Sequence, residues 1–279
     1  MANNSRTRRR ERDDDHPAIW VGYGKLVKLF RTKNGFTQQE LADAVGYSCE
    51  QVASIEQERR PAKTAFTEAA ERVLGAGEVL AELQEDVDRA KLPKFFQDFA
   101  SIEAEAVSRF TYDPLVVPGL LQTPEYARAL LCCHCPPMDD EIIDQRLEAR
   151  LERQKRLTRS PAIEISFVIG EGVLRCPVGG ADVLRTQLQR LLDRSEMRNV
   201  EIQVLPISHG AHAGLHGPMV LLETTSHQQV AYFESHGEGV VITDPNKVSQ
   251  FGLRYGKLRT QALNGMESAR FIERLLGAE

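Results

Sequence analysis

Helical periodicity dominates the first third of the chain. Between residues 19 and 90, apolar positions recur three or four residues apart, as at Leu26, Leu29 and Phe30, and glycines separate successive stretches. Such spacing places the apolar side chains on one face of each helix. The pattern therefore predicts an all-α domain of five helices over residues 19–90.

Helical periodicity continues over residues 91–160, which we predict to be a helical connecting region. The expected helices cover about residues 93–110, 124–132 and 140–159. Pro114 and Pro118 exclude regular helix between the first two of them. Thr123 is a favourable N-cap for the second helix, because Pro124 then takes the first helical position.

After Pro161 the hydrophobic period shortens towards two, which is typical of strands. Five apolar, β-branched segments are expected to be strands, at residues 162–170, 199–207, 217–224, 228–235 and 239–243. A helix over residues 181–195 separates the first two strands, so we expect them to pair in parallel and the last three to form antiparallel hairpins. With two closing helices, residues 161–279 are predicted to form a mixed α+β domain of a multidomain chain.

The composition is that of a soluble globular protein, with 42% hydrophobic and 27% charged residues. No apolar run approaches the roughly 18 residues that would span a bilayer, and the N-terminus lacks the apolar segment of a signal peptide. We therefore expect a cytoplasmic protein without membrane contact. The formal net charge of −5 disfavours indiscriminate binding to nucleic acid and still allows a local basic face.

Residues 1–18 form an arm with a basic block followed by an acidic block, in which five arginines precede Asp13, Asp14 and Asp15. Because almost nothing apolar is available to bury, the arm is predicted to be disordered. Two roles stay open for it: a basic arm that reaches a minor groove, or a tail that only increases solubility.

The segment from Gln38 to Glu56 has the spacing of a helix-turn-helix. Its apolar positions fall where two crossing helices bury side chains against each other, at Leu41, Ala42, Val45, Val52 and Ile55. Gly46 stands where the turn needs a left-handed backbone conformation, and Thr37 with Glu40 has capping-box spacing. An ordinary helical hairpin is the alternative explanation for the same turn.

The stretch LFRTKNGFTQQELADAVGYSCEQVASIEQERRPAK resembles the Xre or phage-repressor family of five-helix DNA-binding domains, over residues 22 to about 90. The resemblance implies that Gln38 binds a backbone phosphate and braces the recognition helix. It also implies that Cys49, Glu50 and Ser54 face base edges, with Ser48 near phosphate.

Arg59, Arg60 and Lys63 follow at once, in the loop that runs beside the DNA backbone in that family. Phosphate contacts there would make binding depend on salt. Glu50 is then free to accept a hydrogen bond from the amino group of cytosine, and so to contribute selectivity more than affinity.

Separated motifs in the second half, among them YDPLVVPGLLQTPEYARALL, VLPISHGAHAGLHGPMVLLE and VAYFES, resemble a second family. It is the domain of unknown function that follows an Xre-type module in actinobacterial WhiJ-like regulators, and the match runs from about Lys94 to the C-terminus. The resemblance implies a dimer and a small partner protein encoded by an adjacent gene.

The candidate sites for other chemistry are weaker. His209, His212 and His216 lie in one glycine-rich loop, but their spacing fits no helical metal site. The cysteines in LCCHCPP, at positions 132, 133 and 135, are too crowded to surround one tetrahedral ion, and reduced thiols are expected. We therefore expect no catalytic residue, metal or cofactor.

The leading hypothesis is a homodimeric, sequence-specific transcriptional regulator that binds a double-stranded operator. One recognition helix reads only a few base pairs, so two half-sites would supply the affinity. Its C-terminal domain would receive a small molecule or a small partner protein. The alternatives are an antitoxin-like protein-interaction module and a metal-dependent or hydrolytic enzyme.

Overall fold

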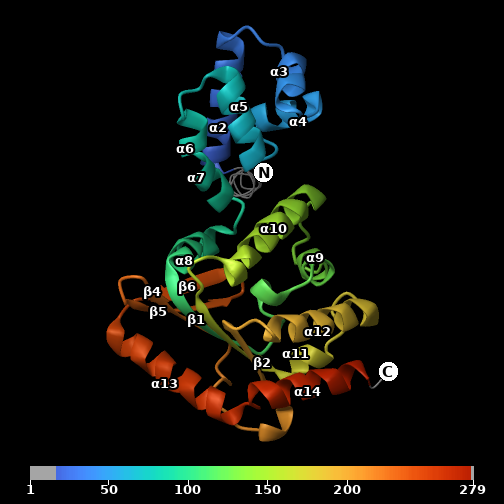
Figure 1. Cartoon of the computed structure of the whole chain (residues 1–279), viewed down its shortest axis with the longest axis vertical. Helices are drawn as coiled ribbons and strands as arrows, with labels where there is room; N and C mark the ends of the chain where they lie inside the picture. The colour runs from blue at the N-terminus through green and yellow to red at the C-terminus, as the bar shows by residue number, and fades with distance from the viewer. Residues whose placement is uncertain (1–16, 278–279) are drawn as a thin grey trace, which may run out of the picture. The chain divides into compact units, whose positions relative to one another are not determined.

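A computed structural model describes residues 17–277 of the chain (Figure 1). The chain divides into two compact units, residues 1–97 and 98–279. The predicted basic and acidic arm lies outside the described residues, apart from Pro17 and Ala18.

The first unit is helical throughout its described part. Its helices are α2 (Ala18–Lys33), α3 (Gln38–Val45), α4 (Cys49–Glu56), α5 (Thr64–Leu74), α6 (Val79–Glu82) and α7 (Gln84–Arg89). Only Leu83 separates the two short helices α6 and α7. With both counted, the described part of this domain has six helices and not the expected five.

The hydrophobic core of this unit includes side chains from α2, α3, α4 and α5. Trp20, Tyr23 and Val27 of α2 are buried in it, and the indole Nε1 of Trp20 donates to Val87 O at 3.1 Å. Gly24 lies where α2 crosses α4, because a Cβ added there would lie 2.4 Å from Ile55 O. Because glycine has no side chain, the backbones of α2 and α4 can approach each other closely at this position.

The second unit contains a six-stranded mixed sheet in the order β3-β2-β1-β4-β5-β6. The strands are β1 (Ala106–Asp113), β2 (Glu164–Gly170), β3 (Val200–Leu205), β4 (Met219–Thr224), β5 (Gln229–Ser235) and β6 (Glu238–Ile242). Strands β1, β2 and β3 run parallel, and β4, β5 and β6 pair antiparallel. The α+β arrangement and the expected pairings are confirmed.

The predicted helical connecting region, residues 91–160, needs correction, because it supplies the strand β1 in the middle of the sheet. Helix α8 (Lys94–Ala104) ends before residue 106 and does not run to 110 as expected. The expected count of five strands is therefore one too low. Polar residues at alternate positions of β1, namely Arg109, Thr111 and Asp113, conceal its apolar pattern.

The remaining helices cover both faces of the sheet. They are α9 (Pro124–Cys132), α10 (Asp140–Arg153), α11 (Glu171–Arg175), α12 (Ala181–Ser195), α13 (Pro245–Gln261) and α14 (Gly265–Leu276), with 3-10 turns η1 (Gly119–Leu121), η2 (Gln154–Thr158) and η3 (Ile207–His209). Helix α9 begins after the expected N-cap Thr123, whose side chain accepts from Tyr126 N.

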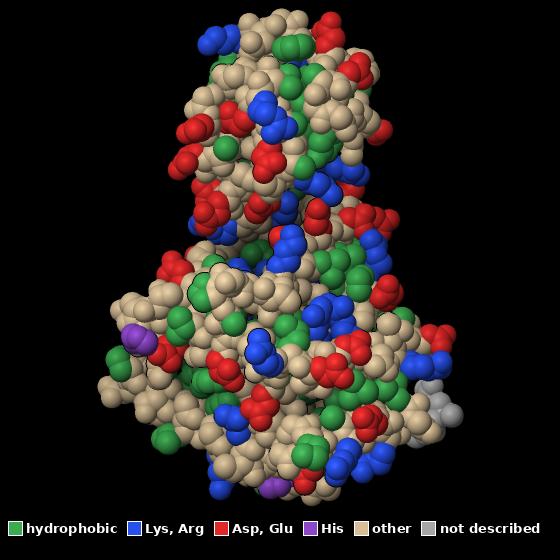
Figure 2. Space-filling view, viewed as in Figure 1, with side chains coloured by type: hydrophobic (Ala, Val, Ile, Leu, Met, Phe, Trp, Pro, Cys, Tyr) green, Lys and Arg blue, Asp and Glu red, His purple; other side chains and the backbone are tan. Residues whose placement is uncertain are grey.

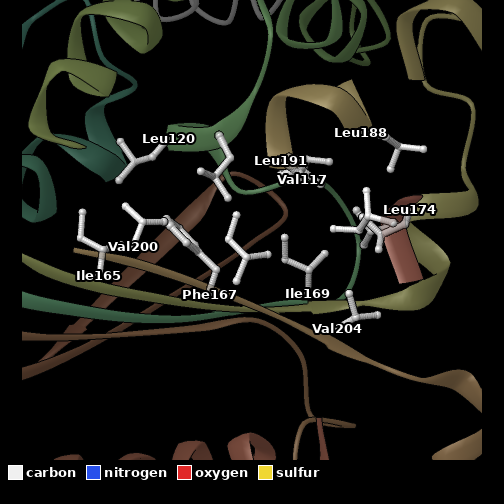
Figure 3. Close-up of a cluster of buried hydrophobic side chains, with 14 of the residues drawn as sticks. Val117, Leu120, Ile165, Phe167, Ile169, Leu174, Leu188, Leu191, Val200 and Val204 are labelled. Carbon is white, nitrogen blue, oxygen red and sulfur yellow. The ribbon is translucent and has the colours of Figure 1, made fainter. Parts of the chain in front are cut away.

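One face of the sheet packs against α12 and α14, and the opposite face packs against α13. Figure 3 shows Ile165, Phe167 and Ile169 of β2 in the same buried cluster as Leu188 and Leu191 of α12. On the α13 side, Tyr255 is buried and its hydroxyl donates to Ser166 of β2. The sheet is thus a central layer between helices.

Candidate functional site

The turn between α3 and α4 has the geometry expected from the sequence. Gly46 adopts the left-handed conformation, with φ 75° and ψ 32°. Thr37 and Glu40 form a capping box at the start of α3, and a second box joins Ser48 to Gln51 at the start of α4. The caps satisfy backbone N–H groups that have no partner within the helix, and so they define where each helix begins.

The two helices bury the side chains that the spacing predicted. Leu41, Ala42 and Val52 are fully buried, and Val45 and Ile55 retain little exposure. The predicted packing of the two helices is therefore confirmed.

A buried ion pair holds the end of α4 against α2. Arg31 Nε donates to Glu56 Oε1 at 2.5 Å, and Nη2 donates to Glu56 Oε2 at 2.9 Å. The same guanidinium donates through Nη1 to Phe36 O, and the hydrogen bond with Glu56 raises the pKa of Arg31. Gln38 Nε2 also donates to Glu56 Oε2, at 2.7 Å. The first residue of α3 thus braces α4 through the Glu56 carboxylate.

The residues expected to contact DNA differ in exposure. Ser48 and Glu50 are exposed at the start of α4, and Gln38 is half-buried. Arg59, Arg60 and Lys63, which follow α4, are all exposed as well. Apart from Gln38, these side chains are therefore exposed at the surface of the first unit.

Two expected base-facing residues are less accessible. Ser54 is buried, because the chain after α4 folds back over it and the backbone N–H groups of Arg59 and Arg60 both donate to Ser54 O. Cys49 is half-buried and packs against the core of the unit. Ser54 therefore has little surface for the expected contact with base edges, and Cys49 keeps only part of its surface for contact.

Two exposed residues of this surface were not among the expected contacts. Gln51 lies in the first turn of α4, and Gln57 is its C-cap residue. Gln57 follows Glu50 by seven residues, which places both on the same side of a helix. That spacing was present in the sequence and could have identified Gln57.

The visible charges of the protein are mixed in sign. Figure 2 shows Lys and Arg side chains interspersed with Asp and Glu over that face of the molecule. The view agrees with the net charge of −5 and indicates that any basic contact surface is local.

The second unit contains a polar cluster that the sequence interpretation missed. Four arginines, Arg109, Arg150, Arg153 and Arg156, gather with Glu103 and Asp113 and are called the arginine cluster here. The available signal was the alternation of polar residues along β1. The expected helix runs to residue 110 and so divides this alternation between a helix and an extended segment, which conceals the strand.

The histidine loop and the cysteines do not form a compact site. His209 and His216 are exposed, whereas His212 packs edge-on against Tyr112 and has a pKa lowered by burial. Cys132, Cys133 and Cys135 are free and exposed. Within residues 17–277, no cluster of three or more His, Cys, Asp or Glu side chains has an arrangement suited to a metal ion.

None of the helices in the described part combines the length and apolar character needed to cross a membrane. A family model described as "Domain of unknown function (DUF5753)" matches residues 96–274. No match to a curated protein or to a solved structure was found.

Proposed function

The chain belongs to the DUF5753 family, and from this premise we propose that it is a sequence-specific DNA-binding transcriptional regulator that acts as a homodimer. The observation that carries the proposal is the capped α3–α4 pair, with its left-handed turn at Gly46 and its exposed first turn of α4. The resemblance of this part to Xre-type domains supports the same function. On this proposal α4 enters the major groove.

The charges around α4 support a division of roles. Arg59, Arg60 and Lys63 are exposed and would contact phosphates, which position a protein on the duplex without reading its sequence. Glu50 is exposed in the first turn of α4 and would accept a hydrogen bond from a cytosine amino group. Gln51 and Gln57 extend the exposed part of the helix surface.

The direct test is selection of preferred sites from random double-stranded DNA by the full chain and by Glu50→Gln. The wild type should select a partly palindromic site with cytosine at one position of each half-site, because a homodimer places two copies of α4 one helical turn apart. The variant should lose the preference at that position only. Identical selected sites for both proteins would exclude Glu50 from base recognition.

A second function, an antitoxin-like interaction module, is favoured by exposed apolar side chains in the second unit. Leu115 follows β1 and is 73% exposed, while Ile207 follows β3 and is 64% exposed. Because β1 and β3 run parallel in one sheet, their C-terminal ends lie at the same end of the sheet. Co-purification of an adjacent-gene product at fixed stoichiometry would support this function. DNA binding would then serve autoregulation.

A further inference from the structure

A row of polar side chains lies on one face of the sheet in the second unit. Arg109, Thr111 and Asp113 occupy alternate positions of β1 and therefore point to one side. Thr111 pairs with Val220, and Val220 pairs with Tyr232, so Tyr232 and Glu234 of β5 point to that side too. This face is opposite to the one that α13 covers.

The carboxylate of Glu103 receives three of the four guanidinium groups. Arg153 donates through Nη2 to Oε1 at 3.0 Å and through Nε to Oε2 at 3.1 Å, and Arg109 and Arg156 also donate to this carboxylate. The side chain of Glu103 is 2% exposed, and that of Arg109 is 7% exposed. One buried carboxylate cannot neutralise three cations, so the interior keeps an excess of positive charge.

Arg150 adds a fourth guanidinium. It donates to the neutral amide oxygen of Gln122 at 2.8 Å, and no carboxylate among the described residues forms an ion pair with it. Burial and then the repulsion from Arg153 lower the pKa of Arg150 to about 10, and burial also lowers the pKa of Arg109 to about 9. Burial is the largest cause of both shifts, and repulsion from Arg153 adds to it at both groups.

Asp113 compensates only part of this charge. Its Oδ2 is buried and has no hydrogen-bond partner among the described residues. Burial raises the pKa of Asp113 to about 7, although Arg109 acts in the opposite direction. The carboxyl group is therefore partly protonated at neutral pH, and one of its polar atoms is available for a hydrogen bond.

Glu234 connects the cluster to solvent. Its carboxylate accepts from the Tyr232 hydroxyl at 2.9 Å and lies close enough to Arg150 and to Asp113 to influence the pKa of both. Glu234 is exposed, whereas Arg150 and Asp113 are half-buried and keep part of their surface. Arg150 and Asp113 thus share one accessible neighbour.

We propose that the arginine cluster binds a small organic anion, whose phosphate or carboxylate oxygens accept from Arg150 and Arg153 while a hydroxyl or amine interacts with Asp113 Oδ2. Guanidinium groups bind both kinds of anion through paired hydrogen bonds. The role of this anion as the signal of the regulator rests on the proposed function. Binding itself requires no DNA.

The test is a calorimetric titration of the full chain, without DNA, at constant ionic strength. One arm uses inorganic phosphate and the other uses malonate, so that the preferred type of anion is identified. Saturable binding of at least one of them is expected, and Arg150→Gln should weaken it at least about tenfold. Arg128→Gln is the matched control, because Arg128 pairs with Asp144 at the surface and stands outside the cluster.

Arg59→Gln/Arg60→Gln should bind the anion as the wild type does, which separates this site from the DNA-binding surface. Arg150→Lys provides a second measure if Arg150→Gln does not fold, and should weaken binding at least about threefold because lysine lacks the paired donors. Absence of saturable binding to both anions would overturn the proposal. Unchanged binding by the folded Arg150 variant, or equal weakening by Arg128→Gln, would overturn it as well. If the wild-type chain binds the anion but binds no DNA, the result would count only against the proposed function.

Discussion

At the scale of single residues, Gly24 sets the distance between two helices. Gly24 has an ordinary backbone conformation. A side chain is excluded there because an added Cβ would lie only 2.4 Å from Ile55 O. Gly22, two residues earlier in α2, is exposed and has nothing within 4 Å of an added Cβ. The two glycines therefore differ only through the packing of α2 on α4.

Gly24→Ala should destabilise the first unit by about 1–3 kcal/mol, because α2 and α4 must separate to admit the methyl group. Gly22→Ala should be neutral or stabilising by up to about 1 kcal/mol, since alanine favours helix. Trp20 is the only tryptophan and is buried in this unit, so its fluorescence follows the unfolding. Equal stability of the two variants would contradict the close approach.

Glu56 is the second residue whose surroundings decide its role. Replacing it by glutamine removes the negative charge that pairs with the buried Arg31 guanidinium. Glu56→Gln should lower the free energy of unfolding by about 3 kcal/mol. Glu68→Gln, an exposed change in α5, should alter it by less than about 0.5 kcal/mol. Denaturant titrations followed by Trp20 fluorescence would measure both, and a small effect at Glu56 would mean that the pair contributes little.

At the scale of elements, β1 differs most from its prediction. The strand pairs with β2 and β4, and its polar residues face the arginine cluster. A strand that is central in a sheet normally carries apolar residues on both faces. Here one face contains the titratable Asp113, which makes the stability of the second unit depend on pH.

The sign of that dependence follows from the raised pKa of Asp113, about 7 against an ordinary 3.8. Between pH 3.8 and 7 the Asp113 carboxyl group has lost its proton in the unfolded chain and retains it in the folded chain. Its contribution to stability is therefore fully present below about pH 4 and is lost as the pH rises through about 7. Asp113→Asn cannot titrate. Its stability relative to the wild type should therefore be higher at pH 8 than at pH 5, as measured by urea unfolding with circular dichroism. A difference independent of pH would mean that Asp113 has an ordinary pKa.

At the scale of the whole molecule, the net charge of −5 makes the DNA affinity depend on a few local cations. Each phosphate contact contributes about 0.9 to the slope of log affinity against log salt concentration. Arg60→Gln should weaken binding to all sequences alike and reduce this slope by about 0.9 per subunit. Arg128→Gln, in the second unit, should leave the slope unchanged. Affinities for several DNA sequences, measured at several salt concentrations, would test both effects. A loss that depends on the DNA sequence would exclude a phosphate contact for Arg60.

Much of the local structure could be predicted from the sequence. The capping box at Thr37, the left-handed Gly46, the N-cap at Thr123 and the helix over residues 181–195 all occur as expected. Each depends on residues that are near one another in the chain. The parallel and antiparallel pairings were also predictable, because the connections between the strands limit the possible topologies.

What the sequence by itself determined is therefore most of the local elements, several of their caps and the family of the second unit. Only the tertiary structure decided that residues 106–113 form a central strand, that Ser54 is covered, and that α2 requires a glycine where it meets α4. It also brought Glu103, Arg150 and Glu234 to one site. These features depend on contacts between residues far apart in the chain, and no periodicity within one segment encodes such contacts.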